Sequence, residues 1–220
     1  MKRTMDIAVG GLLALLAVPV IVVCAVSLAV SLRAFPFFVQ RRVGLDGREF
    51  RLVKLRTLPA GTPPYVDKYR LAGVKIPPFA ALLRRLHLDE LPQLFLVPLG
   101  RMSLVGPRPE MPALHRSFPA TFAALRTAVR RGCTGLWQIG GRSDGLIGET
   151  PYYDEFYLSH RTIALDVWIM AQTARLMVGR GRQFRLADIP VDLRQPVVLT
   201  HPGAAVHPAT VTAMSSGRSA

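Results

Sequence analysis

The chain has 220 residues, of which half are hydrophobic and 19% are charged, and its formal net charge is +14. This composition excludes an acidic disordered chain and a collagen-like repeat, and its two cysteines, Cys24 and Cys133, are too few for a disulfide scaffold. A chain that is both basic and apolar favours either nucleic acid or an anionic membrane with phosphate-bearing ligands as its partner.

The first element is an apolar segment, residues 7–32, which contains no charged residue. A run longer than about 18 such residues is typical of a membrane segment and exceeds the apolar core of a signal peptide. Pro19 divides the run into two arms, and each arm reaches only part of the way across a hydrocarbon core of about 30 Å. Basic residues flank both ends (Lys2, Arg3 and Arg33), which favours a re-entrant helix broken at Pro19. A single kinked transmembrane helix is the alternative.

Residues 37–56 predict a β-hairpin, because the Asp46-Gly47 pair separates two strand-like runs. Residues 79–88 have helical spacing and would place Leu82, Leu83 and Leu86 on one side.

The remaining elements are less regular. Residues 88–99 are a candidate helix with Asp89 at its start and Pro92 in its first turn. We expect an irregular loop over 103–109, a basic helix over 118–131, a glycine-rich loop over 132–148 and one or two helices over 152–178. Residues 201–220 have the composition of a disordered tail.

The adjacent carboxylates Asp89 and Glu90 are the first candidate for chemistry. Neighbouring helical residues point in different directions, so one carboxylate can act as nucleophile or metal ligand while the other orients it. Ordinary helix capping is the alternative interpretation of this pair.

Basic residues supply the candidate phosphate contacts. Arg108 lies between two prolines, which favour an extended backbone and a fixed guanidinium. Arg142 follows Gly141 in a glycine-rich stretch where a ligand can approach the backbone closely. Lys54 and Arg56 are two residues apart at the end of the hairpin and therefore share a strand face. The structural alternatives are exposed arginines in turns and loops.

Other kinds of site are excluded by their motifs. The chain has neither the phosphate-binding loop of nucleotide hydrolases nor the dinucleotide-binding fingerprint nor the serine elbow of hydrolases. Its five histidines are scattered without metal-ligand spacing, so zinc is not expected. No nucleic-acid recognition motif accompanies the charge.

Taken together, the blocks resemble the bacterial sugar transferases, or monotopic phosphoglycosyl transferases, of the small single-domain type. The resemblance runs in order over about residues 2–181. It is carried by residues 2–6, 38–47, 50–57, 83–85, 88–94, 102–110, 134–142 and 153–166. The blocks Leu-Asp-Glu-Leu-Pro-Gln-Leu and Ser-Leu-Val-Gly-Pro-Arg-Pro are the most specific of these.

The resemblance implies transfer of a sugar-1-phosphate from a UDP-sugar to an undecaprenyl-type polyprenyl phosphate, with release of UMP. It implies Asp89 as nucleophile, Glu90 as its partner, both near a Mg²⁺ cofactor, and Arg108 and Arg142 as anion contacts. Such a reaction initiates exopolysaccharide or glycoconjugate assembly, with downstream glycosyltransferases as possible partners. The resemblance places the enzyme in the bacterial inner membrane, with its catalytic domain on the cytoplasmic face. The chain departs from the family pattern at several positions, among them Leu96, Pro98, Leu99, Arg101 and Arg131. A catalytically impaired relative that binds lipid phosphate or a pathway partner is therefore the alternative.

The predicted fold is α+β and mostly helical. Residues 1–33 would form the re-entrant membrane anchor, and residues 34–181 a compact membrane-associated catalytic domain with a β-hairpin and interfacial amphipathic helices. Residues 182–220 would form a tail.

Overall fold

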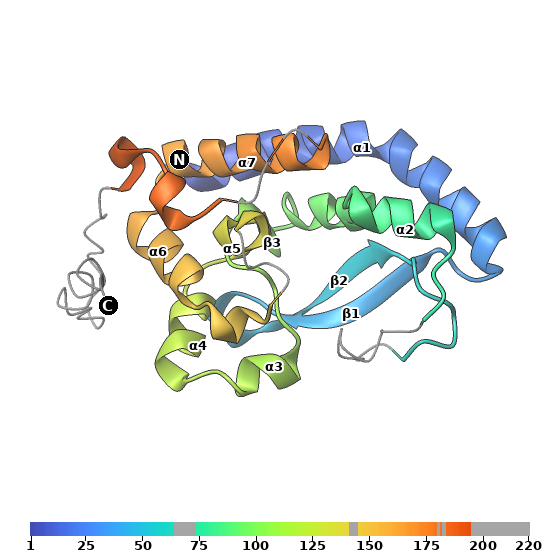
Figure 1. The fold of residues 1–220 in the computed structure, drawn as a ribbon, viewed down its shortest axis with the longest axis horizontal. Coiled ribbons are helices and arrows are strands. Elements are labelled where there is room, and N and C mark those ends of the chain that lie inside the picture. The colour runs from blue at the N-terminus through green and yellow to red at the C-terminus, as the bar shows by residue number, and fades with distance from the viewer. Residues whose placement is uncertain (64–73, 141–144, 180, 182–183, 195–220) are drawn as a thin grey trace, which may run out of the picture.

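The computed structural model describes residues 1–63, 74–140, 145–179, 181 and 184–194, and Figure 1 shows its mostly helical fold. The α-helices are α1 (Lys2–Leu32), α2 (Pro78–Arg85), α3 (Pro112–Arg116), α4 (Ala120–Thr127), α5 (Leu136–Ile139), α6 (Tyr152–His160) and α7 (Ile163–Met177). The strands are β1 (Phe37–Val43), β2 (Glu49–Leu55), β3 (Met102–Val105) and β4 (Arg131–Thr134). Short 3₁₀ helices are η1 (Leu45–Gly47), η3 (Leu88–Leu96), η4 (Ile147–Glu149), η5 (Leu186–Asp188) and η6 (Val191–Arg194).

Helix α1 is continuous through Pro19 and is not divided there into the two helices that the sequence suggested. Its axis changes direction instead, and its second half turns down along the right of the molecule in Figure 1. A bend is the usual result of a proline inside a helix, because proline has no N–H to donate. The helix is long and apolar enough, by length and composition alone, to cross a membrane.

One side of α1 packs on the rest of the protein along most of the helix. Its buried residues recur every three or four positions from Asp6 through Gly10, Ala14, Ala17, Ile21, Cys24 and Ala25 to Leu28. Its other sides expose leucine and valine side chains. Because exposed apolar surface of this extent is unfavourable in water, α1 has the surface of a helix in contact with lipid.

The described residues form two small sheets of two strands each. Strands β1 and β2 form the expected antiparallel hairpin, with Phe37 opposite Leu55 and Val43 opposite Glu49. The turn requires positive φ angles at Asp46 (53°) and Gly47 (74°), which aspartate tolerates and glycine adopts without cost. Strands β3 and β4 pair in parallel and were not expected from the sequence.

Two hydrophobic clusters lie beneath these elements. The larger one gathers side chains from β2, β3 and helices α4 to α7, and it includes Leu104, Trp137, Tyr157 and Leu165. The smaller one joins the second half of α1 to β2 and α2 through Leu28, Leu55 and Leu83.

The structure corrects several expectations. Leu82 and Leu83 do not lie on one side of α2, because adjacent helical positions point about 100° apart. Leu83 is buried together with Ala80, three residues before it, whereas Leu82 is 47% exposed. The segment over 152–178 forms two helices, α6 and α7. The mostly helical fold with a β-hairpin and an apolar N-terminal helix is confirmed. The predicted tail from residue 201 lies outside the described residues.

Candidate functional site

A cavity of about 1200 Å³ lies between the hairpin, η3, α5 and α7. Asp89, Glu90, Lys54 and Arg108 all line it, although they come from three separate parts of the chain. The fold therefore gathers four of the residues that the sequence singled out around one space.

The two carboxylates lie in the first turn of η3 and differ in their partners. His87, with a positive φ of 55°, precedes η3. Side chains of adjacent residues in a 3₁₀ helix point about 120° apart, so Asp89 and Glu90 face different neighbours. Glu90 Oε1 accepts hydrogen bonds from Lys54 Nζ (2.8 Å) and from Arg108 Nη2 (3.4 Å). Asp89 is only 8% exposed, and within the described part of the chain it makes no hydrogen bond and no ion pair.

The pKa values of the two carboxylates move in opposite directions. Burial raises the pKa of Asp89, and the neighbouring Glu90 charge raises it further, against the opposing effect of Lys54. Burial also acts to raise the pKa of Glu90, but Lys54 and Arg108 outweigh it and hold that pKa well below its usual range. Glu90 is therefore a permanent anion between two cations, whereas Asp89 is a less stabilised and more basic carboxylate.

Arg108 is held in place through its backbone as well as its side chain. Its carbonyl oxygen accepts a hydrogen bond from Arg126 (2.6 Å), a residue with no exposed surface. Arg126 in turn donates to Asp154 (2.7 Å), which is also buried. The guanidinium of Arg108 lies 6.0 Å from the ring centroid of Trp137. These contacts restrict how far Arg108 can move when a ligand binds.

Sequence reasoning missed the Arg126–Asp154 pair. Arg126 lies on a helix that the sequence marked only as basic, where an arginine is expected to face solvent. No spacing rule connects positions 126 and 154. The two residues meet only because α4 and α6 pack together in the folded chain.

The other predicted site residues are placed differently. Arg56 lines the cavity, but its guanidinium donates to the carbonyl oxygens of Phe35 and Phe37 at the start of the hairpin. It is therefore partly engaged in holding the hairpin. Gly141 and Arg142 lie outside the described residues, so their predicted role stays a prediction.

The donor set fits Mg²⁺ in its chemistry. Mg²⁺ prefers oxygen ligands and is often held by one or two carboxylates together with substrate phosphates. Asp89 offers a carboxylate without a protein partner among the described residues, and Glu90 offers the oxygen that Lys54 and Arg108 do not occupy. No cluster of three or more histidine, cysteine or acidic side chains occurs in the described residues, so a site built entirely from protein ligands is not found there.

Comparison with known proteins assigns the chain to a family. A sequence model described as "Bacterial sugar transferase" matches residues 1–180. The chain is 30% identical over 189 residues to the exopolysaccharide production protein ExoY of Rhizobium meliloti, covering 78% of this chain and 83% of the relative. It is 34% identical over 177 residues to the UDP-glucose:undecaprenyl-phosphate glucose-1-phosphate transferase of Xanthomonas campestris pv. campestris, covering 74% of this chain and 35% of the relative.

Several relatives are much longer than this match. An uncharacterized sugar transferase of Haemophilus influenzae is 30% identical over 196 residues, which cover 82% of this chain and 41% of the relative. The region that the family model matches, residues 1–180, includes all of the described cavity residues named above. The chain belongs to the bacterial sugar transferase family.

Proposed function

We propose that the protein is a membrane-bound phosphoglycosyl transferase that moves a sugar-1-phosphate from a UDP-sugar to polyprenyl phosphate and releases UMP. The observation that carries the proposal is the contrast between the two carboxylates of one cavity. Asp89 is buried and has no hydrogen-bond or ion-pair partner among the described residues, whereas Glu90 is held by Lys54 and Arg108. The printed name of the Xanthomonas campestris relative describes this class of reaction for that protein.

In the first step a carboxylate oxygen of Asp89 attacks the phosphorus that carries the sugar. The bond from that phosphorus to the oxygen bridging the two phosphates breaks, and UMP leaves with both electrons of the bond. The sugar phosphate remains on Asp89 as an acyl phosphate. In the second step an oxygen of polyprenyl phosphate attacks the same phosphorus, and Asp89 leaves as a carboxylate.

Both steps bring anions together, so the cations of the cavity are needed. Lys54 and Arg108 neutralise Glu90 and present positive charge toward incoming phosphate oxygens. The raised pKa of Asp89 makes it a better nucleophile when ionised. Mg²⁺, held by Asp89 and Glu90, would add positive charge at the phosphates.

We further propose that α1 anchors the domain as a bent, re-entrant helix on the cytoplasmic face of the inner membrane. Both halves of α1 carry buried residues that pack on the catalytic domain, which leaves no clear membrane-spanning section. This arrangement would bring the cavity to the interface, where a soluble UDP-sugar and a lipid phosphate can meet.

The catalytically impaired relative is the weaker candidate. Leu96, Pro98 and Arg101, three of the departures from the family pattern, do not line the cavity. Leu96 packs against the larger hydrophobic cluster, and Arg101 is exposed.

The test is UMP release by the purified protein in detergent, with Mg²⁺, polyprenyl phosphate and a panel of UDP-sugars. We expect lipid-dependent release from one donor, lost in Asp89→Asn and on chelation of the metal. A folded wild-type protein that releases no UMP from any donor would favour the impaired relative. An Asp89→Asn protein as active as wild type would exclude Asp89 as the nucleophile.

A further inference from the structure

One wall of the catalytic cavity is apolar and comes from the two helices on the upper side of the molecule in Figure 1. Leu13 of α1 and Met170, Ala174 and Met177 of α7 line the same cavity as Asp89. A sugar nucleotide offers no long apolar chain to cover such a wall. A polyprenyl chain is apolar throughout, so burying it against this wall is favourable.

The apolar wall reaches the outer surface. Leu13 is 39% exposed and lies at the border between the buried and the exposed sides of α1, and it also lines the cavity. Ala174 is likewise exposed while lining the cavity. The cavity therefore reaches exposed surface at α1 and at α7.

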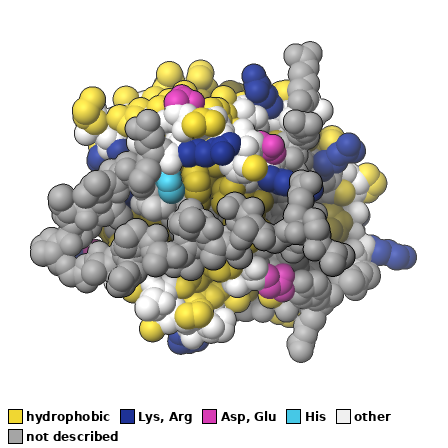
Figure 2. Space-filling model, turned by 60° about the vertical axis from the view of Figure 1, so that its left-hand side comes forward, with side chains coloured by type: hydrophobic (Ala, Val, Ile, Leu, Met, Phe, Trp, Pro, Cys, Tyr) yellow, Lys and Arg dark blue, Asp and Glu magenta, His cyan; other side chains and the backbone are white. Residues whose placement is uncertain are grey.

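Helix α7 extends this apolar surface beside the opening. Its exposed residues Ile163, Val167, Ala171 and Ala174 recur every three or four positions and form a stripe. An ion pair from Lys2 to Asp166 ties the start of α1 to α7. In Figure 2 hydrophobic side chains gather along the upper edge of the molecule, the side on which Figure 1 shows α1 and α7.

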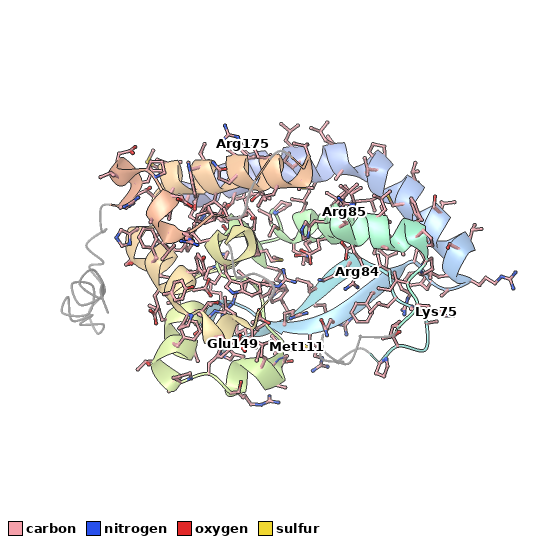
Figure 3. The ribbon with its side chains drawn as sticks, viewed as in Figure 1. Lys75, Arg84, Arg85, Met111, Glu149 and Arg175 are labelled. Carbon is pink, nitrogen blue, oxygen red and sulfur yellow. The ribbon has the colours of Figure 1, made fainter. Side chains whose placement is uncertain are left out.

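A basic side chain lies at the cavity on a third element. Arg85 of α2 lines the cavity and is exposed, and no hydrogen bond or ion pair joins it to the residues that the structure describes. In the view of Figure 3, Arg85 lies on the edge of α2 nearer to α7, whereas Arg84 lies on the edge nearer to β2. Arg84 donates to Thr57, so Arg85 is the more available of the two for a ligand phosphate.

We propose that the acceptor lipid enters the cavity between α1 and α7, with its polyprenyl chain along Leu13, Met170, Ala174 and Met177 and its phosphate drawn in by Arg85. The donor reaches Asp89 from the side of the hairpin and Arg108. This proposal rests on the proposed function and adds a separate entrance for each substrate. Separate entrances allow UMP to leave while the acceptor stays in the membrane.

The test uses two matched pairs of tryptophan substitutions in the purified full-length protein. Ala174→Trp and Leu13→Trp fill the entrance. Their controls, Ala164→Trp and Leu12→Trp, lie at exposed positions of the same helices and do not line the cavity, and Ala164 is outside the apolar stripe of α7. We expect each entrance variant to raise the KM for polyprenyl phosphate about tenfold, as the loss of one or two methylene contacts would. The KM for the UDP-sugar stays unchanged in all four variants.

Arg85→Gln tests the phosphate contact in the same assay. We expect a rise of the acceptor KM by about tenfold, with the donor KM unchanged, as for the loss of one charge-assisted hydrogen bond. Equal effects of Ala174→Trp and Ala164→Trp, or a rise in the donor KM alone, would overturn the proposed entrance. Failure of the proposed function would look different, because the wild type itself would then release no UMP.

Discussion

The pKa values of both Asp89 and Glu90 depend on Lys54. Its ammonium group donates to Glu90 at 2.8 Å and also acts on Asp89, whose pKa it lowers. Burial and the Glu90 charge raise the pKa of Asp89, and the positive charge of Lys54 opposes that rise. A carboxylate must be ionised to act as a nucleophile.

We expect Lys54→Gln to slow UMP release at neutral pH by about 10- to 100-fold, the range for loss of one hydrogen bond to a charged group. Removing the cation raises the pKa of Asp89 further, and activity is lost as the pH falls through that pKa. The acid limb of the pH–rate profile therefore moves to higher pH. The measurement is the rate of UMP release from pH 5 to 9 under otherwise constant conditions.

Lys75 provides the control for this prediction. It is exposed and does not line the cavity, and Figure 3 shows it at the right of the molecule, beyond α2. Lys75→Gln removes the same charge and leaves the profile where it is. An unchanged acid limb in Lys54→Gln would show that Lys54 does not set the ionisation of Asp89.

The sequence predicted the residues that line the cavity better than it predicted the buried residues that hold them in place. Asp89 and Glu90 are adjacent and Lys54 and Arg108 lie in specific blocks, so local pattern was sufficient to select them. The partners of Arg108 could not be selected in this way. Arg126 and Asp154 are polar residues in helices, and only their burial against each other distinguishes them from ordinary surface charges.

At the scale of elements, α1 packs directly against η3, which carries Asp89 and Glu90. Gly10 of α1 lies so close to η3 and its continuation that a Cβ atom there would be 2.6 Å from Cγ1 of Val97. Gly11, the next residue, has no atom within 4 Å of the corresponding position. The chain thus offers two adjacent glycines, of which only one is required for packing.

We expect Gly10→Leu to lower the free energy of unfolding by about 1–3 kcal/mol, because the side chain would push α1 away from Val97. Gly11→Leu is expected to be neutral or to stabilise the protein by up to about 1 kcal/mol, since leucine favours a helix more than glycine does. The measurement is thermal unfolding of both variants in the same detergent.

Since η3 carries Asp89, Gly10→Leu should also slow UMP release, whereas Gly11→Leu should not. Equal unfolding temperatures for the two variants would show that α1 does not pack on η3 as the structure has it.

The elements that the sequence predicted are held by contacts between residues close in sequence, whereas the elements that it missed depend on contacts between residues far apart in sequence. The hairpin is local, with Asp46 and Gly47 setting the turn between strands that are adjacent in sequence. Strands β3 and β4 have four residues each and pair in parallel, with Met102 opposite Arg131. Runs this short show no periodicity, and a parallel pair requires a long connection, so local signals could not reveal it.

At the scale of the whole molecule, both ends of α1 are held by one domain. Near the N-terminus, Asp6 accepts hydrogen bonds from the Ser103 hydroxyl (2.8 Å) and from the Leu104 backbone N–H (3.0 Å). Near the other end, the fully buried Leu28 packs with Leu55 of the hairpin. A transmembrane helix needs about 20 apolar residues clear of any domain that stays in water. The helix α1 does not provide such a section, so its two ends should lie on one side of the membrane.

Thiol labelling can test this topology with Thr4→Cys before the apolar segment and Arg48→Cys in the turn of the hairpin, both at exposed positions. We expect a membrane-impermeant maleimide to label both cysteines in inverted inner-membrane vesicles and neither in intact spheroplasts. The parent protein, with Cys24 and Cys133, supplies the background. A spanning α1 would place position 4 opposite position 48, so that Thr4→Cys alone would react in spheroplasts. If both cysteines react only in inverted vesicles, positions 4 and 48 lie on the same face of the membrane. The bent α1 would then enter and leave the membrane at that face, where the cavity would also open.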